Sequence, residues 1–206
     1  RFARQVIESA RAQVACLLGA EKEEIVFTSG GTEGNNTVLL GVCQDIESSR
    51  STQIISSQME HPSVLACLQM LEKRGFRIQW LSVDSMGCLN LEELENALGS
   101  HPTRLVTLSF CNHEIGNIHP IEKIAELSHK YGALFHCDAT QAVGRIPVDV
   151  SRLAVDFVTM SSHKIYGPKG VGALYYRRSL DENLVVPLLY GGSQERGRRA
   201  GTENTV

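Results

Sequence analysis

The chain has 206 residues, of which 42% are hydrophobic and 21% charged, so it has the length of one domain or a little more and a globular rather than a disordered composition. Its formal net charge of -3 gives no electrostatic reason to expect nucleic acid or an anionic membrane as a partner. No apolar run approaches the ~20 residues that span a bilayer, and the first residues do not resemble a secretory signal peptide.

Segments of helical and strand periodicity alternate along the whole chain. Apolar residues recur at helical spacing after Phe2, and Gly19 ends that helix. Pro62 suits the first position of a later helix, and Asn90 suits the cap of another. In chain order the patterns predict a helix over 2–18, a strand over 24–28, a helix over 35–42, a strand over 53–56, a helix over 62–73, a strand over 76–83, a helix from 90, a strand over 104–110, a helix over 121–131, and strands over 133–138, 157–161 and 171–176.

Strands that alternate with helices through short turns form crossover units, and such units build a parallel sheet. We therefore predict an α/β fold with a mainly parallel seven-stranded sheet and helices on both faces. The segment 104–110 is mostly apolar, as expected of a strand that is buried on both faces. Ligands of such sheets bind outside the carboxyl ends of the strands, so the polar residues that follow the strands are the candidate functional residues.

An anion-binding turn is predicted after the first strand. Residues 28–33 read Thr-Ser-Gly-Gly-Thr-Glu and lead into a helix. The backbone N–H groups and the dipole of a helix N-terminus favour a phosphate group. The turn has neither the lysine of a nucleoside triphosphate loop nor the GxGxxG spacing, so a plain glycine turn with a helix cap is the alternative interpretation.

Two charged residues follow later strands. Lys164 closes the apolar segment 157–161, and a buried lysine is rare without a task, because desolvation lowers its pKa and exposes a nucleophilic amine. Asp138 ends another strand, where it faces a ligand or caps the next element. Lys169 lies in a Gly-Pro-Lys-Gly turn and is predicted to be a surface residue.

Histidines near strand ends raise the question of a metal site. They come from separated elements without an HxH, HExxH or HxxxH pair, and no two of the six cysteines form a CxxC pair, so we predict no metal site. Cys16 and Cys67 lie in helix-like apolar patterns and are expected to be core residues in a reducing compartment, without disulfides. The histidines are His61, His113, His136 and His163.

One small ligand would use these features together. It has a phosphate for the glycine turn, an aldehyde that condenses with a lysine, and a ring nitrogen that pairs with an aspartate. Pyridoxal phosphate combines the three. The sequence therefore indicates a pyridoxal phosphate site around Lys164 and Asp138.

Several motifs together resemble one enzyme family, the NifS/IscS-like cysteine desulfurases, which are class V aminotransferase-like enzymes of fold type I. The resemblance covers the whole chain. It implies that residues 1–206 are most of the cofactor-binding large domain, without the family's N-terminal segment and C-terminal small domain. The matching motifs are residues 27–33 (FTSGGTE), 60–61 (EH), 112–116 (NHEIG), 138–141 (DATQ), 161–170 (SSHKIYGPKG), 191–197 (GGSQERG) and 199–202 (RAGT).

The resemblance implies a role for each site residue. Lys164 would bond the cofactor covalently and remove the α-proton of the substrate, and Asp138 would keep the ring nitrogen protonated. Gln141 would hydrogen-bond the phenolic oxygen of the ring, and His61 would stack on the ring and shuttle protons. Thr202 would reach the cofactor phosphate of the partner subunit in a homodimer. The remaining expected cofactor-binding residues are Gly31 and three at the phosphate, Thr32, Ser161 and His163.

The resemblance also implies the reaction and its setting. L-cysteine would be converted to L-alanine, and its sulfur would be left as a persulfide on an enzyme cysteine. A sulfur-acceptor protein would then receive it for iron–sulfur cluster or thio-cofactor assembly. The expected location is the cytoplasm or an organelle matrix.

The chain departs from the family pattern in three places. His113 stands where the family usually has an asparagine that contacts the phenolic oxygen of the ring, although imidazole can also donate a hydrogen bond. The persulfide cysteine and the arginine that binds the substrate carboxylate would lie beyond the end of this chain, and about forty residues would precede Arg1. We therefore expect residues 1–206 alone to bind the cofactor without desulfurase activity. Arg196 and Arg199 would lie near the cofactor entrance.

Two alternatives are left open by the sequence. A selenocysteine lyase, a cystine lyase or another class V enzyme would keep the cofactor and change the reaction. A non-catalytic scaffold that dimerises or binds a sulfur acceptor would not need Lys164, Asp138, Gln141 and His61 together.

Overall fold

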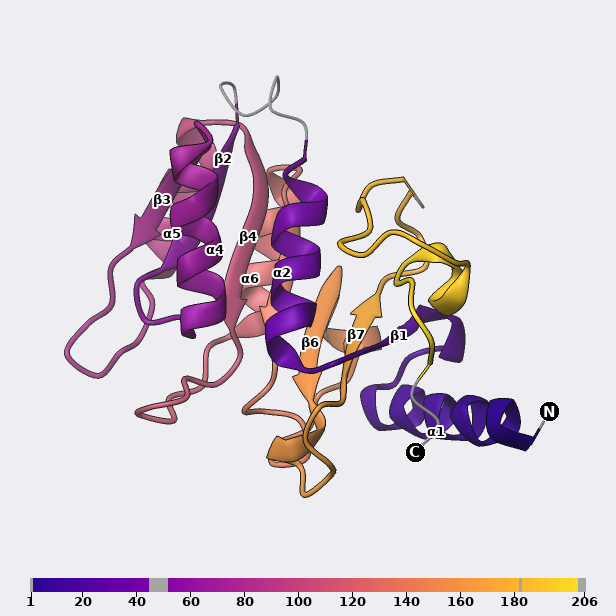
Figure 1. The fold of residues 1–206 in the computed structure, drawn as a ribbon. Helices are drawn as coiled ribbons and strands as arrows, with labels where there is room; N and C mark the ends of the chain where they lie inside the picture. The colour runs from indigo at the N-terminus through magenta and orange to yellow at the C-terminus, as the bar shows by residue number, and fades with distance from the viewer. Residues whose placement is uncertain (1, 45–51, 182, 204–206) are drawn as a thin grey trace.

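One seven-stranded sheet forms the centre of the fold (Figure 1). The computed structural model describes residues 2–44, 52–181 and 183–203. The strand order is β1-β7-β6-β5-β4-β2-β3, in which β7 runs antiparallel to both neighbours and the other pairs are parallel. The strands are β1 (Ile25–Thr28), β2 (Gln53–Ser57), β3 (Arg77–Leu81), β4 (Thr103–Ser109), β5 (Leu134–Asp138), β6 (Phe157–Ser161) and β7 (Gly172–Tyr176).

Helices cover both faces of the sheet and bury two hydrophobic clusters against it. On one face, α2 and α4 contribute Val38 and Leu68 to the cluster. On the other face, α5 and α6 contribute Leu94 and Ile124, and the end of α1 adds Leu18. The helices are α1 (Phe2–Leu18), α2 (Gly31–Val42), α4 (Pro62–Lys73), α5 (Leu91–Ser100), α6 (Ile121–Lys130) and the short α7 (Val150–Leu153).

The predicted fold class is confirmed: the sheet has seven strands, most of its pairs are parallel, and helices lie on both faces. The predicted cap is also present, since Asn90 Oδ1 accepts hydrogen bonds from the backbone of the first turn of α5. The segment 104–110 corresponds to β4, which is buried almost throughout. The antiparallel direction of β7 follows from its connection, because residues 162–171 return the chain directly beside β6.

Some boundaries differ from the prediction. Helix α2 begins at Gly31 rather than at residue 35. Strand β3 ends at Leu81, and Val83 takes part only in an isolated bridge with Leu89. The short helix α7 was not predicted, and Asp149 caps it by accepting from the backbone of Ser151.

The cysteines divide into buried and exposed thiols. Cys67 is buried as expected, but Cys16 lies on the exposed side of α1, so its assignment to the core was wrong. The helical pattern allowed both sides of α1 to be apolar, and only tertiary packing decides which side is covered. All six cysteines are free thiols. No helix within the described ranges is long and apolar enough to cross a membrane.

Candidate active site

A cavity of about 260 Å³ opens at the carboxyl ends of β4, β5 and β6 and at the N-termini of α2 and α4. All the predicted site residues except Thr202 line this cavity. Their convergence follows from the parallel sheet, which brings the ends of successive strands to one edge. The lining residues are Gly31, Thr32, Asn35, His61, Ser63, Ser109, Cys111, His113, Asp138, Thr140, Gln141, Ser161, His163 and Lys164.

One end of the cavity is built to receive an anion. The backbone of Gly30 has φ 151°, a value that favours glycine, and α2 begins at the next residue with its N-terminal N–H groups at the cavity. A Cβ at Gly172 in β7 would lie 2.6 Å from Gly30 Cα, so the close approach of β7 to this turn requires glycine. Two more polar side chains come from Ser161 at the end of β6 and from His163 just after it, with Ser161 Oγ 2.9 Å from His163 Nδ1. These groups favour a phosphate at this end.

The Asp138 side chain is held by two donors. Asn35 Nδ2 donates to Asp138 Oδ2 at 2.7 Å, and the backbone N–H of Thr140 donates to Asp138 Oδ1 at 3.0 Å. An ionised carboxylate accepts hydrogen bonds on both oxygens, and each oxygen still has capacity for another. Asp138 can therefore pair with a protonated ring nitrogen in the cavity.

Lys164 and Gln141 have their functional atoms available. Lys164 ends a single 3₁₀ turn directly after the buried strand β6 and is itself half-buried. Its amine forms no hydrogen bond or ion pair within the described part of the chain. Arg145 Nη1 donates to Gln141 Oε1 at 2.6 Å. The amide oxygen of Gln141 is therefore engaged, which leaves its N–H₂ group to donate to a ligand.

The rings of His61 and His113 meet edge to face, with their centroids 5.4 Å apart. Burial lowers the pKa of His61, the positive charges of His113 and Lys164 lower it further, and the Asp138 carboxylate opposes them. His61 is therefore neutral at pH 7.

Glu60 is a buried acid beside the site whose role the sequence did not predict. It is 3% exposed, and Ser109 Oγ donates to Glu60 Oε1 at 3.4 Å, while Oε2 has no partner. Ser109 pairs with Asp138 across β4 and β5, so the two acids flank one residue. Burial raises the pKa of Glu60 to about 8, and the negative charge of Asp138 adds to the effect. Glu60 is therefore mainly protonated at pH 7.

Sequence reasoning also missed five residues that line the cavity. Asn35 could have been found, because it lies one helical turn after Gly31 on the same face of α2. Thr140 and Ser63 lie two residues after Asp138 and His61, respectively, which is a weaker signal. Ser109 and Cys111 carry no signal of their own, and they reach the cavity only because β4 lies beside β5.

Thr202 lies outside this cavity. It lines a second, largely apolar cavity of about 310 Å³ between α1, the end of β1 and the loop at Gly170. Neither Arg196 nor Arg199 lines the first cavity. Arg196 Nη1 donates to the backbone of Glu23, and Arg199 Nε donates to Glu33 Oε1 at 2.9 Å.

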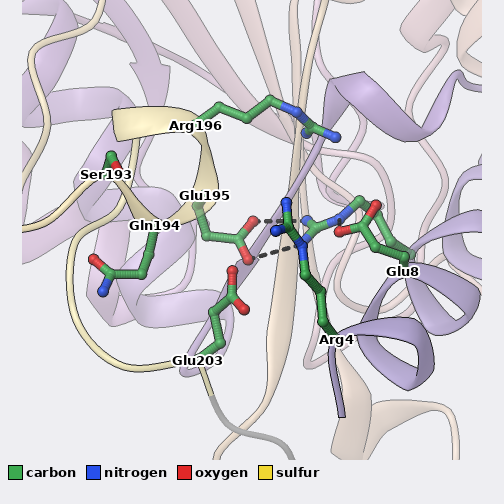
Figure 2. A pocket seen from close by; sticks show the side chains of 8 residues that line it. Arg4, Glu8, Ser193, Gln194, Glu195, Arg196 and Glu203 are labelled. Carbon is green, nitrogen blue, oxygen red and sulfur yellow. Dashed lines mark hydrogen bonds and ion pairs between the residues drawn. The ribbon is translucent and has the colours of Figure 1, made fainter. Parts of the chain in front are cut away.

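A buried ion pair anchors the segment that carries Thr202. Arg11 of α1 donates through Nη1 and Nη2 to the two carboxylate oxygens of Glu195, at 2.7 and 2.9 Å. Glu195 Oε2 also accepts from the backbone of Phe27, and Arg11 Nη1 donates to the carbonyl of Ile25. Figure 2 shows Glu195 with its neighbours Ser193, Gln194, Arg196 and Glu203 beside Arg4 and Glu8. The ion pair therefore fastens the C-terminal segment to α1 and β1.

The described residues also contain no cluster of side chains that supports a metal site. Within residues 2–44, 52–181 and 183–203, no group of three His, Cys, Asp or Glu side chains could hold a metal ion. His136 lies fully buried inside the sheet between Thr107 and Thr159, at 2.8 and 3.0 Å from their hydroxyls. Burial lowers the pKa of His136 to about 4, so it is neutral and structural.

The fold and the cavity define a class of protein: an α/β protein whose strand ends bring a lysine amine, a hydrogen-bonded aspartate and the N-terminus of a helix to one cavity. Comparison with known proteins identifies the family. Residues 2–206 match the aminotransferase class-V family, and the chain belongs to it.

The chain is similar to several cysteine desulfurases of that family. It is 48% identical over 200 residues to the cysteine desulfurase of Nostoc sp. (strain PCC 7120), which covers 97% of this chain and 48% of that protein. Two solved structures superpose closely. The structure of a NifS-like protein has a TM-score of 0.92 and 40% sequence identity, and the match covers 98% of this chain and 55% of that one. The structure of SspA in complex with cysteine has a TM-score of 0.91 and 36% sequence identity, and the match covers 98% of this chain and 58% of that one. The chain spans about half the length of the curated relatives it matches.

The family implies pyridoxal phosphate, and the donor set of the cavity fits that group. Two buried polar atoms of cavity-lining residues, Asn35 Oδ1 and Thr140 Oγ1, have no partner. A Cβ at Gly31 would lie 3.1 Å from Thr140 Oγ1, so a side chain there would fill the anion end. Unpaired buried polar atoms are costly in a protein that binds nothing, which supports a polar ligand in this cavity.

Proposed function

We propose that this protein is a pyridoxal phosphate-dependent cysteine desulfurase, and that residues 1–206 are most of its cofactor-binding large domain. The observation that carries the proposal is the meeting of the free Lys164 amine and the doubly held Asp138 carboxylate in one cavity that ends at the N-terminus of α2. The similarity to cysteine desulfurases along 97% of the chain supports the choice of reaction.

The residues that would hold the cofactor divide between its two ends. Gly31, Thr32, Ser161 and His163 would bind the phosphate. Lys164 would bond the aldehyde carbon, and Asp138 would accept from the ring nitrogen. The bound cofactor supplies an electron-accepting ring that stabilises negative charge at the Cα of an amino acid. His113 would donate to the phenolic oxygen together with the N–H₂ group of Gln141.

The chain's own groups account for the proton movements. The Lys164 amine would accept the proton from the substrate Cα. The carboxyl group of Asp138 would hold a proton at the ring nitrogen. His61 lines the same cavity and would present its ring to the reacting atoms. A cysteine thiolate would attack the sulfur of the substrate, since the thiolate and not the thiol is the nucleophile. An S–S bond would form as the substrate Cβ–S bond breaks, and the electron pair of the broken bond would stay on the carbon that becomes the methyl group of alanine.

The substrate and partners follow from the same proposal. The substrate is L-cysteine, and a similar solved structure, that of SspA in complex with cysteine, supports that choice. Thr202 lines a separate cavity, which agrees with an expected task at the cofactor of a second subunit in a homodimer. A sulfur-acceptor protein would take the sulfur, in the cytoplasm or an organelle matrix where free thiols persist.

A peptide map tests the proposal directly. The protein is incubated with pyridoxal phosphate, reduced with borohydride and digested, and the lysine that carries the pyridoxyl mass is identified. We expect the label on Lys164, with Lys169 in the same tryptic region as an unlabelled internal comparison. Scattered label, or none on a folded protein, would overturn the proposal in favour of a non-catalytic scaffold.

A further inference from the structure

A continuous hydrogen-bonded connection runs from Asp138 to His61. Asn35 of α2 uses both hydrogens of its amide nitrogen: one goes to Asp138 Oδ2 at 2.7 Å and the other to Ser63 Oγ at 3.0 Å. Ser63 Oγ in turn lies 2.8 Å from His61 Nδ1. The connection therefore joins two residues of the proposed site through two residues that no motif assigned.

The direction of each hydrogen bond is fixed by the carboxylate. Asp138 can only accept when ionised, so the amide group of Asn35 must present its nitrogen and not its oxygen. With both amide hydrogens used, Ser63 Oγ receives a hydrogen bond from Asn35. The hydroxyl hydrogen of Ser63 is then free to point at His61 Nδ1.

A second donor converges on the same ring nitrogen. The backbone N–H of Ser63 donates to His61 Nδ1 at 3.1 Å, because the His61 side chain caps the N-terminus of α4. A nitrogen that accepts from two donors carries no proton of its own. The neutral imidazole of His61 must then carry its proton on Nε2.

We propose that Asn35 and Ser63 are positioning residues that hold His61 as the Nε2-protonated tautomer, so that His61 presents an N–H donor to the reacting atoms. A proton taken up by His61 would have to go to Nδ1, where it would meet the Ser63 backbone N–H and displace the Ser63 hydroxyl hydrogen. His61 therefore acts as a donor at Nε2 rather than as a base. The tautomer does not depend on the cofactor, but its use in catalysis rests on the proposed function.

The groups that surround His61 agree with this assignment. His113, whose ring meets that of His61 edge to face, and Lys164 both disfavour a positive charge on His61, and Asp138 alone favours it. Burial also favours the neutral ring. Asn35 itself is 1% exposed and lines the cavity. Water therefore competes little for the hydrogen bonds of its amide group.

The test is a titration of His61 by long-range proton–nitrogen NMR in the full chain without cofactor, with the signal assigned through His61→Gln. In the wild-type protein we expect the neutral form to carry its proton on Nε2. Ser63→Ala removes one donor to the neutral ring, so the acid dissociation constant of His61 should fall by roughly three- to tenfold. Ser63→Thr keeps the hydroxyl and serves as the matched control, with a value within about twofold of wild type.

Asn35→Ala tests the next link of the connection. If Asn35 acts through Ser63, this change should alter the His61 titration in the wild-type background and leave it unaltered in Ser63→Ala. A purely structural role for Asn35 would change stability without that dependence. An Nδ1-protonated neutral ring, or the same titration in wild type and in a folded Ser63→Ala, would overturn the inference.

The cofactor arm separates this inference from the proposed function. Each variant is also loaded with pyridoxal phosphate, reduced and mapped. If Lys164 is not labelled in the wild-type protein, the proposed function fails, while the titration still decides the tautomer. If Lys164 is labelled in every variant and the titration does not move, the function stands and the positioning role fails.

Discussion

Two regions of this protein bury polar side chains, and they differ in how fully the buried polar atoms are hydrogen-bonded. At the Arg11–Glu195 pair, every polar atom of both side chains that is buried has a protein partner. At the cavity, Asn35 Oδ1 and Thr140 Oγ1 have none, and neither has the nearby Glu60 Oε2. A saturated network holds the chain together, whereas spare hydrogen-bonding capacity marks the place where a ligand is expected.

Backbone geometry adds to the contrast. Glu195 and Arg196 both have positive φ, at 47° and 58°, a conformation that costs free energy in residues other than glycine. The three hydrogen bonds that Glu195 accepts from Arg11 and from the backbone of Phe27 stabilise that strained turn. The anion end of the cavity uses glycine at its unusual position instead, at Gly30. At the anion end of the cavity, glycine adopts the unusual backbone conformation at a lower cost in free energy than another residue would.

The largest expected effect comes from the free amine of the cavity. Lys164→Ala should abolish the borohydride-trapped cofactor and lower alanine formation from cysteine in the full protein by at least about 10³-fold, because the covalent and the proton-accepting group are both lost. Its unfolding midpoint should stay near that of wild type, since Lys164 makes no hydrogen bond or ion pair in the described chain. Lys130→Ala is the matched surface control and should retain activity. Activity within tenfold of wild type in Lys164→Ala would contradict the assignment.

The opposite result is expected at the saturated pair. Glu195→Ala leaves the Arg11 guanidinium buried without its main partner, so the free energy of unfolding should fall by about 3–5 kcal/mol. Urea denaturation measures the loss. The exposed Lys130–Glu95 pair, broken by Lys130→Ala, should produce no comparable change. Equal effects of the two changes would show that the buried pair is not an anchor.

A pH dependence of stability is expected from Glu60. Its pKa is raised from 4.5 to about 8 in the folded protein, so the folded state binds more protons than the unfolded state between these values. Stability should therefore fall as pH rises from about 4.5 towards 8, by a few kcal/mol or less. Glu60→Gln keeps the shape and removes the titration, so its stability should be flatter over that range. Parallel curves for the two proteins would refute the buried neutral acid.

The smallest effect is expected from thiol labelling. Burial raises the pKa of Cys43 and of Cys67 to about 12, so neither forms a thiolate at pH 8. Cys16 and Cys88 are exposed and should be alkylated first, with no loss of structure. Mass spectrometry of the native protein over time separates the two groups. Early modification of Cys43 or Cys67 would mean that the cluster around α2 and α4 opens readily.

Local patterns were sufficient to predict the sheet but not the edges of the site. The strands were recognisable as short segments with apolar or alternating side chains between helical segments, and the parallel arrangement then placed Asp138 and Lys164 at one edge. The start of α2 was placed too late, because Gly31 and Gly34 are poor helix formers. A Cβ at Gly34 would lie 2.8 Å from Thr159, so tertiary packing against β6 determines that glycine and overrides its propensity.

Long-range pairs explain what the sequence could not reveal. Arg11 and Glu195 are 184 positions apart, and no periodicity relates them. The environment of Glu60 became interpretable only when Ser109 and Asp138 were found side by side on β4 and β5. The identity of the site could be predicted from residues that follow strands, whereas the network that positions those residues depends on which strands are neighbours.

The pairing of β1 with β7 also bears on how the protein is made. Strand β1 leaves the ribosome well before β7, its partner in the described part of the sheet, which lies roughly 150 residues later in the chain. At ordinary elongation rates the nascent β1 would wait about 7–30 seconds before it could join the sheet. During that interval the apolar side chains of Ile25 and Val26 are open to other chains, so a nascent-chain chaperone that covers the segment around β1 would raise the yield of folded protein.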